Sequence, residues 1–189
     1  MHTPVRHILI FIQLLLLAGL VRAEPLTGDI ITRWMDSQES VMAWSARHEA
    51  ELSKYDSQEA RNPLDMTAEQ MLAPVHAAGL YDDLKGVLGK AGFSSPEQWS
   101  DISMRIARAA MALEFEKMEA ERGGLDAQLQ EVDRQAGLSA EQKQMIKQNL
   151  QQSYAMMASM AKAPEADKAA LRPHMDALRA MMAAAQGGQ

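Results

Sequence analysis

Residues 95–124 decide the fold, and they read SPEQWSDISMRIARAAMALEFEKMEAERGG. Three signals at the start of this stretch mark the beginning of a helix. Ser95 offers a capping hydroxyl, a proline occupies the first helical position, and Gln98 can reach back towards the cap. Gly123 and Gly124 supply a stop or a bend at the other end. The stretch therefore predicts one long helix with defined ends.

This helix is apolar on two roughly opposite faces. One face carries Trp99, Ile102, Ile106, Ala110 and Leu113, and the other carries Met104, Ala107, Met111, Phe115 and Met118. A helix with two apolar faces must bury both of them, so we expect it at the centre of a bundle. The remaining stripe should be a solvated edge with pairs at one-turn spacing, and it consists of Asp101, Arg105, Arg108, Glu116 and Glu119.

Two further helix starts use the same capping chemistry. Thr67 is followed three residues later by Gln70, and Ser139 is followed by Gln142 at the same spacing. In such a capping box the hydroxyl accepts from the backbone of the third helical residue, whose side chain reaches back to the cap. Both pairs therefore predict helices that begin at the next residue.

The rest of the chain also favours helices. We expect a first helix from Thr27 to about Tyr55, while Pro74 and Pro173 should kink or divide the segments that contain them. No segment shows the alternation of apolar and polar residues that marks a strand. The prediction is an all-α, kinked bundle of five to seven helices, formed as a single domain by residues 24–189.

The first 23 residues have the features of a secretory signal peptide. Arg6 and His7 precede an apolar run over residues 8–21, and the chain then offers a cleavage site after Ala23. The run is shorter than a membrane-spanning helix, so no membrane span is expected after cleavage. The absence of cysteine and of glycosylation sequons favours a bacterial periplasm, with secretion beyond it as the other expected destination.

Charge and composition exclude several classes of partner and site. Lys and Arg number 19 against 25 Asp and Glu, and because Arg6 and Arg22 lie in the leader, the mature part has a net charge of −8. An acidic chain without basic runs does not suit nucleic acid or anionic lipid. With no cysteine in the chain, disulfides, thiolate zinc sites and cysteine nucleophiles are excluded.

Residues 66–70 and 138–142 carry a resemblance to a known family. They read MTAEQ and LSAEQ, and each is one conservative change away from the Leu-Thr-x-x-Gln motif that occurs twice in the Spy and CpxP family of periplasmic chaperones and stress sensors. The chain is similar to that family in size, in its leader and in its content of methionine and glutamine. The resemblance implies a cradle-shaped helical protein, often a homodimer, that holds partly unfolded envelope proteins without ATP.

Methionine is abundant, with 15 copies, and it suggests two uses. Met156, Met157 and Met160 cluster in one predicted helix and His174 lies in the next, and thioethers with imidazole are ligands for Cu(I). Methionine is also a common filler of helical cores and of adaptable binding surfaces. Soft-metal binding by these four residues therefore stands as the alternative to a protein-binding role.

An enzymatic role finds little support in the sequence. There is no Gly-x-Ser-x-Gly motif and no phosphate-binding loop, and helix capping already explains Ser95, Ser139 and Thr67. Residues far apart in sequence can still converge, so a helical envelope enzyme, or an accessory subunit of one, is the second alternative. We expect no cofactor.

The preferred prediction is a non-enzymatic periplasmic factor that captures apolar segments of envelope proteins, with chaperone-like breadth. Trp44 falls off the main apolar face of the first helix, which makes it a candidate exposed anchor for a partner. Met181 and Met182, near the end of the chain, are the other candidate protein-binding residues.

Overall fold

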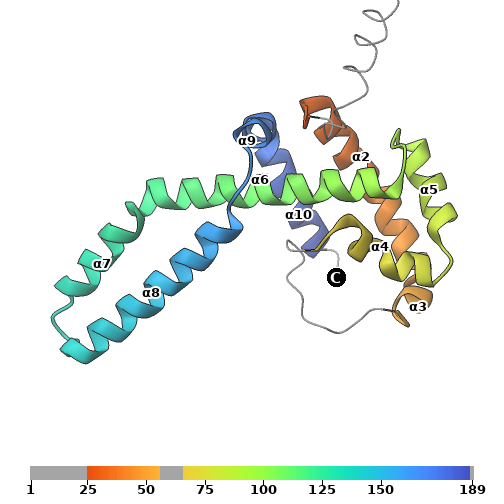
Figure 1. Ribbon diagram of the computed structural model, residues 1–189. Coiled ribbons are helices and arrows are strands. Elements are labelled where there is room, and N and C mark those ends of the chain that lie inside the picture. The colour runs from red at the N-terminus through yellow and green to blue at the C-terminus, as the bar shows by residue number, and fades with distance from the viewer. Residues whose placement is uncertain (1–24, 56–65, 188–189) are drawn as a thin grey trace, which may run out of the picture.

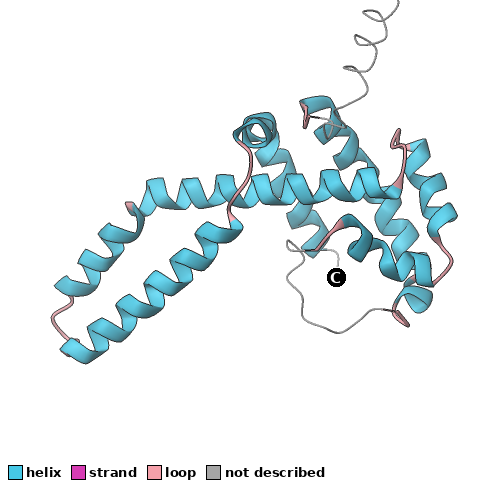
Figure 2. Cartoon of the chain, viewed as in Figure 1, coloured by secondary structure: helices cyan, strands magenta, loops and turns pink. Residues whose placement is uncertain are grey.

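The computed structural model describes residues 25–55 and 66–187, without the side chains of Met160 and of residues 185–187. The predicted leader and residues 56–65 lie outside the described residues. Within the described part every regular element is helical and there is no strand (Figure 2), which confirms the all-α prediction. None of the described helices is both long and apolar enough to cross a membrane.

The described helices are arranged as Figure 1 shows. Their bounds are α2 Gly28–Arg47, α3 Glu49–Leu52, α4 Ala68–Ala77, α5 Tyr81–Lys90, α6 Pro96–Arg122, α7 Gly124–Arg134, α8 Ala140–Met160, α9 Glu165–Leu171 and α10 Met175–Gly187, with a 3₁₀ turn, η2, at Arg172–His174. The number of helices slightly exceeds the five to seven expected. The reason is local: the first predicted helix breaks at His48, and the turn containing Pro173 separates α9 from α10.

The long helix predicted from residues 95–124 is central. α6 begins after the Ser95 cap and ends at Gly123, which adopts a left-handed φ of 72°. It packs against α2, α4, α5, α7, α8 and α9. Of its first apolar face, Ile102, Ile106 and Leu113 are buried, so the prediction of a core position for that face is confirmed.

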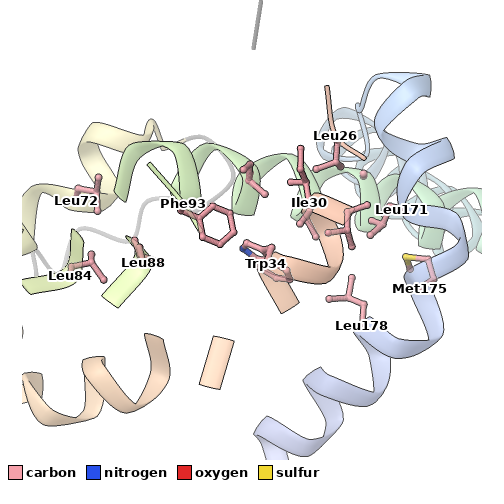
Figure 3. Close-up of a cluster of buried hydrophobic side chains, with 14 of the residues drawn as sticks. Leu26, Ile30, Trp34, Leu72, Leu84, Leu88, Phe93, Leu171, Met175 and Leu178 are labelled. Atoms are coloured by element: carbon pink, nitrogen blue, oxygen red, sulfur yellow. The ribbon is translucent and has the colours of Figure 1, made fainter. Parts of the chain in front are cut away.

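One hydrophobic core joins the two ends of the described chain. Figure 3 shows Ile30 and Trp34 of α2 beside Leu171, Met175 and Leu178, which come from α9 and α10. The core continues to α4 and α5 through a second group, which includes Leu72, Leu84, Leu88 and Phe93. The C-terminal helices therefore close the core that the N-terminal helix begins.

Two tryptophans and two serines connect α2 with α6 inside the core. The Trp34 indole N–H donates to the Ser103 hydroxyl at 2.6 Å, and the Trp99 indole N–H donates to the Ser37 hydroxyl at 2.8 Å. The two indole rings stack with their centroids 6.4 Å apart. Because each buried N–H has a partner, the large rings can be buried without loss of a hydrogen bond.

α7 and α8 form a hairpin, here called the arm, which projects from the rest of the molecule (Figure 1). Val132 is the only buried residue of α7, and no described side chain of α8 is buried. Gly123 and Gly124 both have a positive φ, and they turn the chain between α6 and α7, which confirms the predicted bend. The arm is thus a two-helix layer with little core of its own.

The charged stripe of α6 is not a solvated edge, which corrects the sequence analysis. Arg105 donates two hydrogen bonds to the buried carboxylate of Asp167 in α9, at 2.6 and 3.0 Å. Glu116 accepts from Lys168, and this pairing, with the pairing of Lys168 and Glu165, raises the pKa of the Lys168 ammonium. Arg105 and Glu116 therefore hold α9, and Glu119 accepts from Tyr154 of α8, while Asp101 at the start of the stripe is exposed.

Candidate functional site

A groove opens where α6, α8 and α10 meet. Its volume is about 450 Å³, and we call it the methionine groove after the residues that line it. They are Ala110, Met111, Glu114, Phe115, Met118, Met157, Ala161, Met175, Leu178, Arg179 and Met182. Such a volume lies within the range of protein sites that hold small apolar ligands or a few side chains of a partner.

The second apolar face of α6 forms one wall. Met111 and Met118 are seven residues apart, about two helical turns, with Phe115 between them, so all three project to the same side. The first apolar face of α6 is used in the core, and no further helix covers this second face completely. Met104, at the start of the second face, is buried, so the groove is formed by the later part of that face, at Met111, Phe115 and Met118.

Exposure increases from the floor of the groove to its rim. Met175 is 6% exposed and belongs to the core as well, while Met157 is 37% and Met182 is 52% exposed. The rim methionines have three rotatable side-chain bonds each and are free to move, whereas Met175 is held by its neighbours. The site thus combines a fixed floor with an adaptable rim.

Among the described residues, Glu114 and Arg179 are the only charged ones that line the groove, and they are paired with each other. The Arg179 guanidinium donates to Glu114 at 2.7 Å and to Asp176 at 2.6 Å. The hydrogen bond to Glu114 is the main reason why the pKa of Arg179 is raised, so the guanidinium is charged at every ordinary pH. With this pair satisfied, the remaining lining offers apolar side chains, which suit the binding of apolar surface.

Tyr154 fixes α8 against α6 beside the groove. Its hydroxyl donates to the Glu119 carboxylate, and its ring meets Phe115 with centroids 5.1 Å apart. Since Phe115 also lines the groove, this contact positions Met157, one turn further along α8.

Trp44 is not an exposed anchor, and this prediction is wrong. The side chain is 3% exposed and packs in the core. Its indole N–H donates to Asp83 of α5 at 2.8 Å, and the same carboxylate lies 3.2 Å from His48 Nε2. Its position off the main face of α2 is explained by α5, which covers that side.

The structure does not bring the other candidate residues together at one site. Met182 lines the groove, and Met181 packs partly buried against the core. Of the predicted soft-metal set, only Met157 lines the groove: Met156 is exposed elsewhere on α8, and the side chain of Met160 lies outside the described residues. The His174 ring lies against Gly28 at the start of α2. In the described part of the chain, no three His, Asp or Glu side chains are placed to share a metal ion.

The predicted caps serve helix starts. Thr67 with Gln70 and Ser139 with Gln142 form complete capping boxes, as expected. Ser95 also caps its helix, but the Gln98 side chain accepts from the backbone of Ser94 at 2.7 Å, one residue before the cap. The residues that carry the family resemblance thus have a structural use in both copies.

A second hollow lies between α2 and α5 and is more polar. Its volume is about 530 Å³, and Arg33, Asp36, Arg47 and Lys90 contribute charge to its lining. Arg33 already donates to the Gly92 carbonyl at 3.0 Å and lies over the Phe93 ring. Three of these four charged side chains are basic and one is acidic, so the lining has a small positive excess.

Comparison of the chain with protein-family models, with curated proteins and with solved structures finds no match. The groove was not foreseen from the sequence as one site, because its walls come from residues 110–118, 157–161 and 175–182. The one signal that pointed to it was the second apolar face of α6, which needed a partner.

Proposed function

We propose that this protein is a non-enzymatic binding factor of the bacterial cell envelope, which captures apolar segments of partner proteins in the methionine groove. The observation that carries the proposal is the groove itself, which five methionines and Phe115 line and which is open to solvent at Met157 and Met182. Burial of apolar surface supplies the driving force, about 25 cal/mol for each Å² removed from water.

Methionine supports a broad rather than a narrow choice of partner. Its unbranched and polarizable side chain adapts to differently shaped apolar groups, so one groove can accommodate several sequences. A groove lined by the stiffer side chains of leucine and isoleucine would bind one partner shape more tightly and other shapes more weakly. The adaptable rim formed by Met157 and Met182 suits chaperone-like capture of many segments.

The groove favours a helical segment as its occupant. An extended peptide brings a backbone N–H and C=O at each residue, and each needs a hydrogen-bond partner when it is buried. Glu114 and Arg179, the charged residues of the lining, already satisfy each other. A helix satisfies its own backbone and presents only side chains, as in other complexes where an amphipathic helix enters an apolar groove.

The sequence supports an envelope location and protein partners there. The leader over residues 1–23 favours export, and the lack of both cysteine and glycosylation sequons favours a bacterial periplasm over a eukaryotic secretory route. A net charge of −8 in the mature part favours protein clients over nucleic acid and anionic membranes.

Capture can be tested with denatured clients whose aggregation is followed by light scattering. We expect the protein to suppress aggregation of several clients at a near-equal molar ratio. The double variant Met157→Glu, Met182→Glu should lose at least about tenfold in affinity, because each carboxylate would have to be buried beneath the client. The matched control is Met42→Glu, which places the same charge on an equally exposed methionine of α2 that does not line the groove.

Failure to suppress aggregation of any client would contradict the proposal. So would suppression that the groove variant and the control variant retain equally. Circular dichroism should show unchanged helix content in both variants, since all three side chains lie at the surface.

A further inference from the structure

The outward side of α8 carries an uncharged stripe of two methionines and two side-chain amides that the groove does not use. Met145, Asn149, Gln152 and Met156 are spaced by four, three and four residues, so they lie on one face of the helix. All four are exposed, and the two methionines are 63% and 62% exposed. We call these four residues the outer stripe.

The contacts of α8 confirm that the outer stripe points away from the molecule. Lys147 pairs with Asp133 of α7 at 2.6 Å, and Tyr154 contacts Phe115 and Glu119 of α6. At about 100° per residue, Lys147 and Tyr154 lie on the side of α8 opposite Met145 and Met156. One side of α8 therefore holds the arm together, and the other has no partner within the described chain.

The arrangement of the stripe is symmetric. Met145 and Met156 lie equally far from the midpoint between Asn149 and Gln152. If two copies of α8 pack antiparallel about a two-fold axis at that midpoint, each Met145 meets a Met156 and each Asn149 meets a Gln152. A two-fold interface requires a self-complementary surface of this kind. Asn and Gln side chains both donate and accept, so the central pairs can hydrogen-bond.

Charge gives a second and independent reason for a second copy as the occupant. In this acidic protein, most faces of two copies would repel each other, yet no charged residue occurs from Gln148 to Ala161. The same antiparallel arrangement brings Glu141 of one copy within about two residues, or roughly 3 Å along the axis, of Lys162 in the other. Both are exposed and have no ion pair within the described chain.

We propose that two copies of this chain associate through the outer stripes of α8, packed antiparallel. The inference does not depend on capture in the methionine groove, because the outer stripe lies on a different side of α8. The stripe extends over about 17 Å of helix, and two such helices bury less than the roughly 800 Å² per partner of a standard interface. The dimer is therefore weak, with half-association at micromolar concentrations or above.

The absence of native cysteines allows a direct test of the pairing. Met145→Cys and Met156→Cys are prepared separately, mixed in equal amounts and oxidised. The antiparallel arrangement predicts a disulfide between the two different variants, with little product in either variant alone. Identical positions would lie about 17 Å apart along the axis, much further than the roughly 4.4–6.8 Å between the Cα atoms of a disulfide.

Met42→Cys, on α2, is the control for random collisions, since its exposure is close to that of the stripe methionines. Cross-linking of the mixture well above that of all three single variants would support the proposal. Equal cross-linking in the single variants, or none in the mixture at the highest concentration, would overturn it.

Sedimentation of the protein supplies a second readout, with variants that change only charge. Asn149→Lys with Gln152→Lys places like charges opposite each other and should weaken association about tenfold or more. Asn149→Glu with Gln152→Lys places opposite charges across the same axis and should restore it. Restoration would support the antiparallel pairing, whereas a monomer at every concentration for the unmodified protein would refute it. Circular dichroism checks that these surface variants remain folded.

Discussion

At the scale of single residues, whether a side chain is buried depends on its partners on other helices, which its position in the sequence does not reveal. Trp44 lies off the main apolar face of α2, which is why the sequence favoured an exposed anchor. The structure instead buries it against α5, where Asp83 accepts from its indole N–H. No local pattern identifies Asp83 as this partner, because it lies on another helix.

Trp44→Ala should therefore destabilise the fold. Loss of a buried tryptophan costs about 3–5 kcal/mol, through lost burial and the cavity that remains. Chemical denaturation followed by circular dichroism measures the change. Met42→Ala, an exposed position on the same helix, should change stability by less than about 0.5 kcal/mol. If Trp44→Ala left the free energy of unfolding unchanged, the result would contradict the burial of this side chain in the core.

The pH dependence of stability should include a contribution from Glu97, in the first turn of α6. Burial raises the pKa of its carboxyl, but hydrogen bonds from its own backbone amide, from Ser95 and from Tyr81 outweigh that effect, and the pKa is lowered. The Tyr81 hydroxyl donates to Glu97 at 2.9 Å, and its ring stacks on His76.

A carboxyl with a lowered pKa in the folded state stabilises the fold above its ordinary pKa of 4.5, and this contribution is lost as the pH falls. We expect Glu97→Gln to lower the Tm at pH 7 and to have a smaller effect at a pH low enough to protonate the native carboxyl. Glu39→Gln, at an exposed position of α2, is the control. An equal loss of Tm at both pH values would contradict this account.

At the scale of elements, capping residues and hydrophobic periodicity predict the helices, and Gly123 with Gly124 predicts the bend between α6 and α7. The predicted capping boxes at Thr67 and Ser139 and the two apolar faces of α6 are present in the structure. The charged stripe of α6 was misinterpreted, because one-turn spacing indicates neighbours on the same helix and says nothing about α9. Arg105 reaches Asp167 across 62 positions of sequence, which no periodicity reveals.

Gly123 should be necessary for the direction of the arm. Its φ is 72°, a conformation that costs an L-residue about 1–2 kcal/mol, and an added Cβ would lie 2.9 Å from Cβ of Ala127. Gly123→Ala should thus lower the free energy of unfolding by at least that amount. Gly89→Ala, inside α5 with open space around the position, should instead stabilise by about 0.4–1 kcal/mol. Similar effects of both variants would show that the left-handed bend is unimportant.

At the scale of the whole molecule, the methionines are divided between the core, the methionine groove and the outer stripe. The sequence predicted the all-α bundle because hydrophobic period and caps are local properties. The groove depends on three helices that are far apart in sequence, and nothing in residues 110–118 indicates how closely α10 approaches. An excess of methionine over what one core requires was visible, but its division between core, groove and outer stripe was not.

Limited oxidation by hydrogen peroxide should reveal this division. Oxidation of a thioether to the sulfoxide requires access to sulfur, so Met42, Met145, Met156 and Met182 should react before Met104 and Met175, which are buried. Peptide mass spectrometry at short times measures the order. Raising the protein concentration should slow Met145 and Met156 relative to Met42, since association through the outer stripe covers the first two. Equal rates for Met175 and Met42 would mean that α10 leaves the core readily, and then the fixed floor of the groove would not exist.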